Sequence, residues 1–260
     1  MDDQPNQSLL IEGDPPPFGI TNPGGSSSFL LLGDHAGNRV PTRLGSLGLS
    51  DADRVRHIAW DIGIAALGQR LAGELDATFI SQSYSRLVID CNRDPSSDDA
   101  MPFISDGTAV AANQRLDATE RAARIEAIHT PYHAAIAAEL ARRDAADRKT
   151  LLVALHSFTP SLLGEDRPWH IGILYGGGDE HFARTVLSLL VGLGEFPVGN
   201  NQPYAMDDTD YGVPRHAFAA RRPYVEIEIR QDLLATDVHI DGWTDVLARI
   251  LVAAAGRTPG

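Results

Sequence analysis

Short apolar runs alternate with amphipathic helical patterns along most of this 260-residue chain, and this alternation constrains the fold more than any other feature. Apolar runs predict strands at residues 29–32, 78–81, 87–90, 151–155, 171–174 and 225–229. Helical spacing predicts helices at 51–75, 117–143, 180–193 and 241–255, with Pro131 kinking the second. This order of elements favours a mostly parallel sheet with helices on both faces.

The chain divides into an N-terminal arm and one domain. Residues 1–28 are rich in proline and end in a Gly-Gly-Ser-Ser-Ser run, which predicts an extended arm that lies on the surface. No linker interrupts residues 29–260, so we expect them to form a single domain.

Charge and cysteine content exclude several classes of partner. The chain has 22 Lys plus Arg against 35 Asp plus Glu, a formal net charge of -13, which argues against nucleic acid and anionic membrane surfaces as partners. It has no apolar run long enough for a membrane span and no signal-peptide pattern. Cys91 is the only cysteine, so an internal disulfide is impossible, and we expect a cytoplasmic protein. The oligomeric state is not indicated.

Candidate chemistry lies just after the apolar runs, because parallel sheets bind ligands outside the carboxyl ends of their strands. His35 follows the first predicted strand, Asp90 ends the third, and His156 follows the fourth. Two histidines and an acid are typical of a catalytic zinc site with three protein ligands and one open position. Spacing alone leaves the alternative open that each is a hydrogen-bonded structural residue. Glu226 and Glu228 alternate within 225–229 and therefore face the same side of that strand.

Other chemically capable residues have simpler interpretations. His129 and His133 have an i, i+4 spacing that can bind metal, but they lack the His-Glu-x-x-His pattern, so His133 is expected to support a helix or loop. Cys91 is expected to be a small buried apolar residue. Ser157 lacks the Gly-x-Ser-x-Gly elbow of serine hydrolases. The polar segments 94–113 and 200–222 are expected to be loops near the site, and we call the second of them the late loop.

Six motifs occur in a fixed order around these positions. They are DHAGNRVP at 34–41, AWDIG at 59–63, SRLVIDCNRDP at 85–95, PYH at 131–133, HS at 156–157 and IEIRQDL at 227–233. With them, the chain resembles the N-formylglutamate amidohydrolase family over about residues 29–235. That family is distantly similar to zinc carboxypeptidases and aspartoacylases. The resemblance implies a single-domain, three-layer α/β/α fold with a mostly parallel mixed sheet, phosphorylase/hydrolase-like and zinc-carboxypeptidase-like.

The resemblance also implies roles for individual residues. One zinc ion would be held by His35, His156 and a third ligand, and Glu228 would be the general base. Asp61 is the expected third ligand, with Asn38 or a water as alternatives, because Asn38 stands where carboxypeptidases have a ligand Glu. Substrate would be bound by three residues: Asn92 and Arg93, which would grip a carboxylate, and Arg86, which alternatively anchors its loop through Asp90.

The implied reaction is hydrolysis of a small anionic N-acyl amino acid, with N-formylglutamate as the nearest example. Arg215, Arg221 and Arg222 in the late loop are expected to serve a second substrate carboxylate. Asp34 stands where formylglutamate-specific members usually have another residue, which leaves the natural substrate open. The alternatives are another N-acyl amino acid, a cell-wall peptide, or a metal-free binding protein that kept the fold.

Overall fold

A seven-stranded mixed sheet forms the centre of the protein. The structure is a computed structural model, and it describes residues 8–258. The strand order is β1-β3-β2-β6-β11-β9-β10. The strands are β1 (Phe18–Thr21), β2 (Phe29–Gly33), β3 (Thr78–Gln82), β6 (Leu151–Phe158), β9 (Ile171–Leu174), β10 (Val198–Asn200) and β11 (Tyr224–Arg230). The four strands β3, β2, β6 and β11 are mutually parallel, whereas β1 and β9 run antiparallel to β3 and β11.

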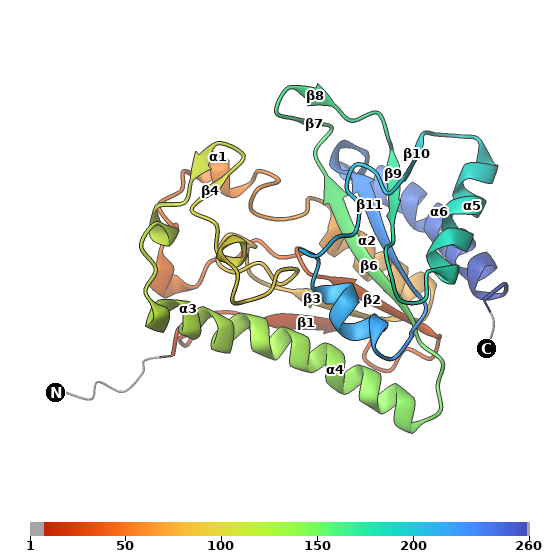
Figure 1. The fold of residues 1–260 in the computed structure, drawn as a ribbon, viewed down its shortest axis with the longest axis horizontal. Helices are drawn as coiled ribbons and strands as arrows, with labels where there is room; N and C mark the ends of the chain where they lie inside the picture. Colours follow the sequence, from red (N-terminus) through yellow and green to blue (C-terminus); the bar gives the residue numbers. More distant parts are fainter. Residues whose placement is uncertain (1–7, 259–260) are drawn as a thin grey trace.

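Helices cover both faces of this sheet, as the alternation of patterns predicts (Figure 1). The helices are α1 (Asp51–Arg54), α2 (Ile64–Glu74), α3 (Ala118–Arg124), α4 (Thr130–Ala145), α5 (His181–Leu193) and α6 (Asp237–Ala255). Helices α2 and α5 pack against the sheet, α6 packs against both of these helices, and α4 lies across the opposite face. The central strands β2 and β6 are buried along their whole length, because both faces are covered.

Two short hairpins project from the edge of the sheet at which β2, β6 and β11 end (Figure 1). One is β4–β5 (Ile104–Ser105 and Thr108–Ala109), and the other is β7–β8 (Ser161–Leu162 and Glu165–Asp166). Five of the predicted strands, near residues 29, 78, 151, 171 and 225, are confirmed with small extensions. Strand β1 falls inside the segment predicted to be an extended arm, and residues 1–7 of that arm lie outside the described residues.

The strand predicted at 87–90 is wrong, because this buried apolar segment forms a turn. Two of its carbonyls are satisfied by side chains instead of a neighbouring strand. Asn113 donates to the Leu87 carbonyl at 2.8 Å, and Arg124 donates to the Val88 carbonyl at 2.9 Å. An apolar run indicates burial, but burial alone does not require a sheet when polar side chains reach the backbone.

Two predicted helices are interrupted. The 51–75 segment separates into α1 and α2, and Gly63 lies between them with a φ of 89°, a conformation that favours glycine. The 117–143 segment continues from α3 to α4 through a π-helical turn, Ile125–His129, and Pro131 lies in the first turn of α4. At that position the missing amide of proline does little harm to the helix. Both interruptions lie close to residues of the candidate site.

Candidate metal centre

Backbone contacts bring His35 and Asp61 together. His35 lies in the turn after β2, and Asp61 lies in the segment between α1 and α2. The Asp61 amide donates to the His35 carbonyl at 2.9 Å. The chain after His35 also passes very close to Ser83, because a Cβ on Gly37 would lie 2.1 Å from the Ser83 carbonyl carbon. Only glycine permits this approach, so the turn requires glycine at position 37.

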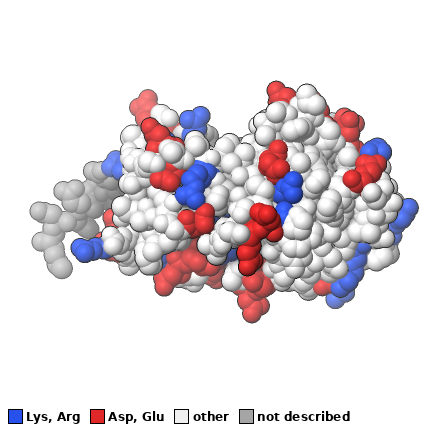
Figure 2. All heavy atoms as spheres, turned by 90° about the horizontal axis from the view of Figure 1, so that it is seen from above, with Lys and Arg blue, Asp and Glu red and all other residues white. Residues whose placement is uncertain are grey.

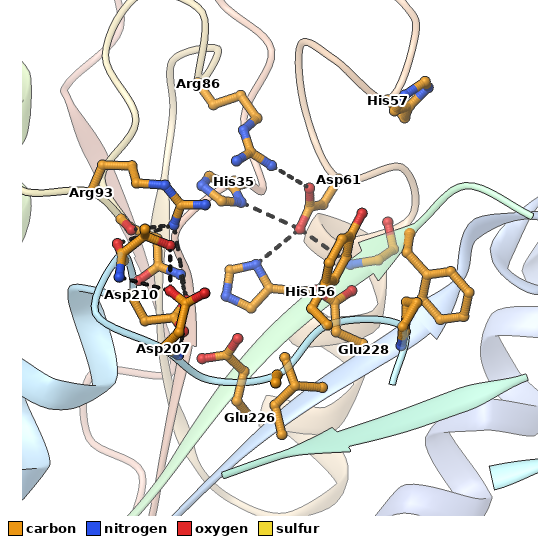
Figure 3. A pocket seen from close by; sticks show the side chains of 18 of the residues that line it. His35, His57, Asp61, Arg86, Arg93, His156, Asp207, Asp210, Glu226 and Glu228 are labelled. Carbon is orange, nitrogen blue, oxygen red and sulfur yellow. Dashed lines mark hydrogen bonds and ion pairs between the residues drawn. The ribbon is translucent and has the colours of Figure 1, made fainter. Parts of the chain in front are cut away.

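His156 reaches the same point from β6. Its Nδ1 atom lies 3.0 Å from Oδ2 of Asp61, and the Ser157 amide donates to that oxygen at 3.1 Å. Nδ1 of His35 lies 3.5 Å from the same oxygen. Figure 3 shows both imidazoles turned toward the Asp61 carboxylate. The prediction that His35 and His156 meet at the sheet edge is therefore confirmed.

These three side chains form a group that can hold a metal ion. One ligand atom from each of His35, Asp61 and His156 lies within 4.8 Å of the other two, and all three residues are buried. Within residues 8–258 this is the only such group of His, Cys, Asp and Glu. Two imidazoles and a carboxylate make up the protein ligand set of many catalytic zinc sites. Asn38, the alternative third ligand, instead donates its amide to the Arg54 carbonyl at 2.6 Å.

A second carboxylate orients His35. Nε2 of His35 lies 2.7 Å from Oδ1 of Asp90, and Arg86 donates to Oδ2 of Asp90 at 2.6 Å. A carboxylate on the far nitrogen of an imidazole selects its tautomer and direction, which is a common support for metal-binding histidines. Asp34 lies near His156 in a comparable place, with Oδ2 3.8 Å from Nε2, but no described group hydrogen-bonds that nitrogen.

The electrostatics of the site favour a positively charged occupant. Burial alone would raise the pKa of Asp61, but His35 and His156 lower it below its ordinary value. Burial likewise opposes the charge of Asp90, and Arg86 with His35 brings its pKa well below the usual range. The pKa of His156 rises well above its ordinary value, because Asp61 and Glu226 outweigh burial. Carboxylates that stay ionised while buried need a nearby cation.

Glu226 and Glu228 lie side by side on β11 with their carboxylates at the site. Glu228 is paired with His156 in the parallel ladder, and both glutamates are buried. Oε2 of each has no hydrogen-bond partner among the described residues. Burial raises the pKa of Glu226 to about 7 and that of Glu228 to about 8. Neither forms an ion pair with Arg230, which instead binds Asp232.

The residues predicted to bind substrate are already engaged within the protein. Arg93 donates to the carbonyls of Asn92 at 2.8 Å and Thr209 at 3.3 Å. Oδ1 of Asn92 accepts the amides of Tyr211 at 3.0 Å and Gly212 at 2.8 Å, which ties the late loop to this segment. Asn92 therefore has a clear structural task, and its carboxylate-binding role stays a prediction.

A cavity of about 490 Å³ contains these groups. Its lining includes the metal-binding candidates, the two glutamates, both predicted arginines and part of the late loop: His35, Asp61, Arg86, Asn92, Arg93, His156, Asp207, Asp210, Glu226 and Glu228. In the view of Figure 3, Arg86 lies on the opposite side of His156 from Glu226. The prediction for Arg215, Arg221 and Arg222 is wrong, because none of them lines this cavity and Arg222 pairs with Asp144 instead.

Sequence reasoning missed a buried histidine chain behind the Asn92 segment. His129 Nε2 lies 3.2 Å from the Arg93 carbonyl, and His133 Nε2 lies 2.9 Å from the Cys91 carbonyl. His133 Nδ1 then lies 2.9 Å from Nε2 of His216, which lies in the π-helical turn Pro214–Phe218 of the late loop. Burial lowers the pKa of His133 to about 2 and that of His216 to about 4. The i, i+4 spacing was the available signal, and the expected supporting role of His133 is confirmed.

Known proteins share this architecture. Residues 27–235 match the model of a family described as N-formylglutamate amidohydrolase. A gene product of Agrobacterium tumefaciens, solved by crystallography, is 35% identical with a TM-score of 0.92, and the match covers 96% of this chain and 98% of that chain. The N-formylglutamate amidohydrolase of Ralstonia eutropha is 20% identical with a TM-score of 0.63, over 92% and 97% of the two chains. No curated protein matches this chain.

Fold, site and comparisons together define the class of protein, a hydrolase that acts on amide bonds. The chain belongs to the N-formylglutamate amidohydrolase family. Within residues 8–258, no helix is both long and apolar enough to cross a membrane.

Proposed function

We propose that this protein is a metal-dependent amidohydrolase that cleaves a small N-acyl amino acid, with N-formylglutamate as the reference substrate. One observation carries the proposal: the His35–Asp61–His156 group and the unpartnered carboxylate of Glu228 face one cavity. The family supports the reaction type, and the single buried cysteine supports a cytoplasmic setting.

His35, Asp61 and His156 would hold the metal, for which zinc fits the mixed nitrogen and oxygen ligands. When bound, a divalent ion supplies Lewis acidity, which lowers the pKa of water and polarises an amide carbonyl. Asp90 keeps His35 in the required tautomer, and Arg86 keeps Asp90 ionised. The ligand atoms of His35, Asp61 and His156 already lie close together, so they could bind a cation while Asp90 keeps its hydrogen bond to His35.

Glu228 is the proposed general base. Its Oε2 atom has no hydrogen-bond partner among the described residues, so it is free to accept a proton from water. It would then deliver that proton to the leaving nitrogen as the amide carbon–nitrogen bond breaks. The pKa of about 8 reflects burial, and a cation beside the carboxylate lowers it toward neutrality, where a base both ionises and accepts protons efficiently. Glu226 is the neighbouring acid and the natural comparison for this role.

Arg93 is the proposed partner of the substrate carboxylate, together with Asn92. Arg93 lines the cavity and donates to the Thr209 carbonyl of the late loop. A guanidinium matches a carboxylate through two parallel hydrogen bonds. Arg86 is the proposed second contact, since it lines the same cavity and its Nη1 lies 3.8 Å from Oδ1 of Asp61. Both arginines offset the acidic lining and the overall charge of -13.

The test measures formate and glutamate released from N-formyl-L-glutamate by the purified protein, alongside its metal content. We expect equal amounts of both products, loss of activity with a chelator, and recovery on addition of zinc. Glu228→Gln should abolish release with metal retained, and Glu126→Gln, an exposed glutamate of the π-helical turn, is the matched control. Full activity of metal-free protein contradicts the mechanism. Failure of the metal-loaded protein to cleave any N-acyl amino acid contradicts the function and favours a binding role.

A further inference from the structure

A second cavity adjoins the one that holds the candidate metal centre. It measures about 530 Å³, and its lining shares His57, Arg86, Arg93 and Tyr204 with the first cavity. We call the cavity with the metal-binding candidates the inner chamber and this second cavity the outer chamber. Four shared lining residues make the two chambers parts of one cleft. A substrate bound at the candidate metal centre can therefore extend past the two arginines.

The outer chamber lies between the two projecting hairpins. Leu162 and Leu163 of the β7–β8 hairpin form one wall, and the β4–β5 hairpin contributes Ser105 and Asp106 to the other. Arg56 holds the second hairpin in place, because it donates to Asp106 at 2.7 Å and to Thr108. The face from which the hairpins project shows basic and acidic side chains intermixed near its middle (Figure 2).

The two chambers differ in chemistry. The inner chamber is lined by carboxylates, among them Asp207, Asp210, Glu226 and Glu228. The outer chamber also contains acids, but each is paired: Asp90 with Arg86, Asp99 with Arg93, and Asp106 with Arg56. The rest of its lining includes five apolar residues, Ile58, Leu87, Pro102, Leu162 and Leu163. The inner chamber, with Asn92 and Arg93 beside the metal-binding candidates, therefore suits the polar amino-acid end of a substrate, and the outer one suits an uncharged apolar group.

The exposure of Leu163 supports the same conclusion. This leucine, in the turn between β7 and β8, is 85% exposed although it lines the outer chamber. An exposed leucine on a chamber wall gains stabilisation when an apolar ligand covers it. A formyl group is a single carbon and provides no chain that could cover this wall.

We propose that the natural substrate is an N-acyl amino acid whose acyl group is an apolar chain of several carbons. The acyl chain lies in the outer chamber, and the amino acid lies in the inner chamber beside Asn92, which lines only that chamber. This proposal rests on the amide hydrolysis proposed above and specifies its substrate. Hydrolysis releases the carboxylic acid of the chain and the free amino acid, with one water consumed.

The experiment compares N-formyl-, N-acetyl-, N-butanoyl- and N-hexanoyl-L-glutamate as substrates of the metal-loaded protein. Each methylene buried against apolar residues favours binding by about fourfold, so kcat/KM for the hexanoyl compound should exceed that for the formyl compound by at least about tenfold. Leu163→Asp should reduce this ratio at least about fivefold, because a carboxylate on the wall repels the chain. The φ of 53° at Leu163 is one that Asp tolerates better than Leu, so the hairpin should fold.

Val191→Asp is the matched control. Val191 is an apolar residue of α5 that is 57% exposed and lines neither chamber, so its substitution should leave the hexanoyl-to-formyl ratio unchanged. Faster cleavage of the formyl compound than of the hexanoyl compound overturns the acyl assignment and leaves amide hydrolysis intact. An equal loss with all four substrates in Leu163→Asp also overturns it. Failure to cleave any of the four, or the same acyl series on other amino acids, overturns the proposed function itself.

Discussion

Two groups of buried histidines differ in their partners. His35 and His156 face carboxylates, whereas His129 and His133 face backbone carbonyls, and His133 also faces another imidazole. The first setting raises the pKa of His156 well above its ordinary value, and the second lowers the pKa of His133 to about 2. Histidines of equal burial therefore have their pKa values shifted in opposite directions, and the partner decides which group suits a cation.

The largest expected effect comes from removing a ligand of the first group. His156→Ala should lose nearly all bound metal and activity, because the remaining imidazole and carboxylate cannot complete a zinc site. His133→Asn should retain the metal. Metal analysis of both purified variants checks the comparison, and equal metal loss in the two would break it.

Glu228→Gln should reduce kcat by about 10²–10⁴-fold, because glutamine keeps the shape of the side chain but cannot accept the proton. Metal content and melting temperature should change little. The same measurements on Glu226→Gln show which acid is the base. A larger catalytic defect in Glu226→Gln would transfer the role to that residue.

Arg93→Ala should lower kcat/KM by about 10²-fold, since the substrate carboxylate loses a buried partner. Arg93→Lys should not restore it, because an ammonium cannot form the two parallel hydrogen bonds. The control is a substrate whose α-carboxylate is amidated: wild-type protein should discriminate against it, and Arg93→Ala should not. Equal discrimination by both proteins would assign the carboxylate to another residue.

Asp90→Asn should weaken metal affinity by about 10–100-fold without removing a ligand, because His35 loses the carboxylate that orients it. Competition with a chelator of known affinity measures the change. An unchanged affinity would mean that the carboxylate partners, which separate the two histidine groups, do not support metal binding.

The group formed by His129 and His133 should make the folding stability of the protein sensitive to acid. His133 has a folded pKa of about 2, below the ordinary value near 6.5, so its stabilisation is complete above pH 6.5 and declines as the pH falls below it. At pH 5 the loss is about 2 kcal/mol, because the unfolded state binds a proton that the folded state does not. His133→Asn should be less stable at pH 7 but should lose less between pH 7 and 5. Denaturant unfolding at both pH values measures this, and a parallel decline in both proteins would contradict it.

The sequence predicts most of the sheet and the meeting of His35 with His156, because both depend on patterns within short segments. Continuous apolar runs identify β2 and β6, and the parallel topology then brings the residues after them to one edge, so His35 and His156 meet as expected. The AWDIG motif identifies Asp61 as a candidate, but the position of Asp61 depends on a backbone hydrogen bond to His35.

The other features depend on contacts between distant segments, which local patterns do not encode. Residues 87–90 read as a strand because they are apolar, yet Asn113 and Arg124 satisfy them as a turn. The His133–His216 contact joins α4 to the late loop, and the outer chamber requires both hairpins together. Neither can be inferred from spacing.

The most direct test of the comparison is to locate the metal by anomalous X-ray scattering at the zinc edge in crystals of the protein grown with zinc. We predict one strong peak bounded by Nδ1 of His35, Oδ2 of Asp61 and Nδ1 of His156. A strong peak at His133 and His216, with none at the first group, would contradict the central claim that carboxylate partners make one histidine group a metal centre and leave the other a structural support.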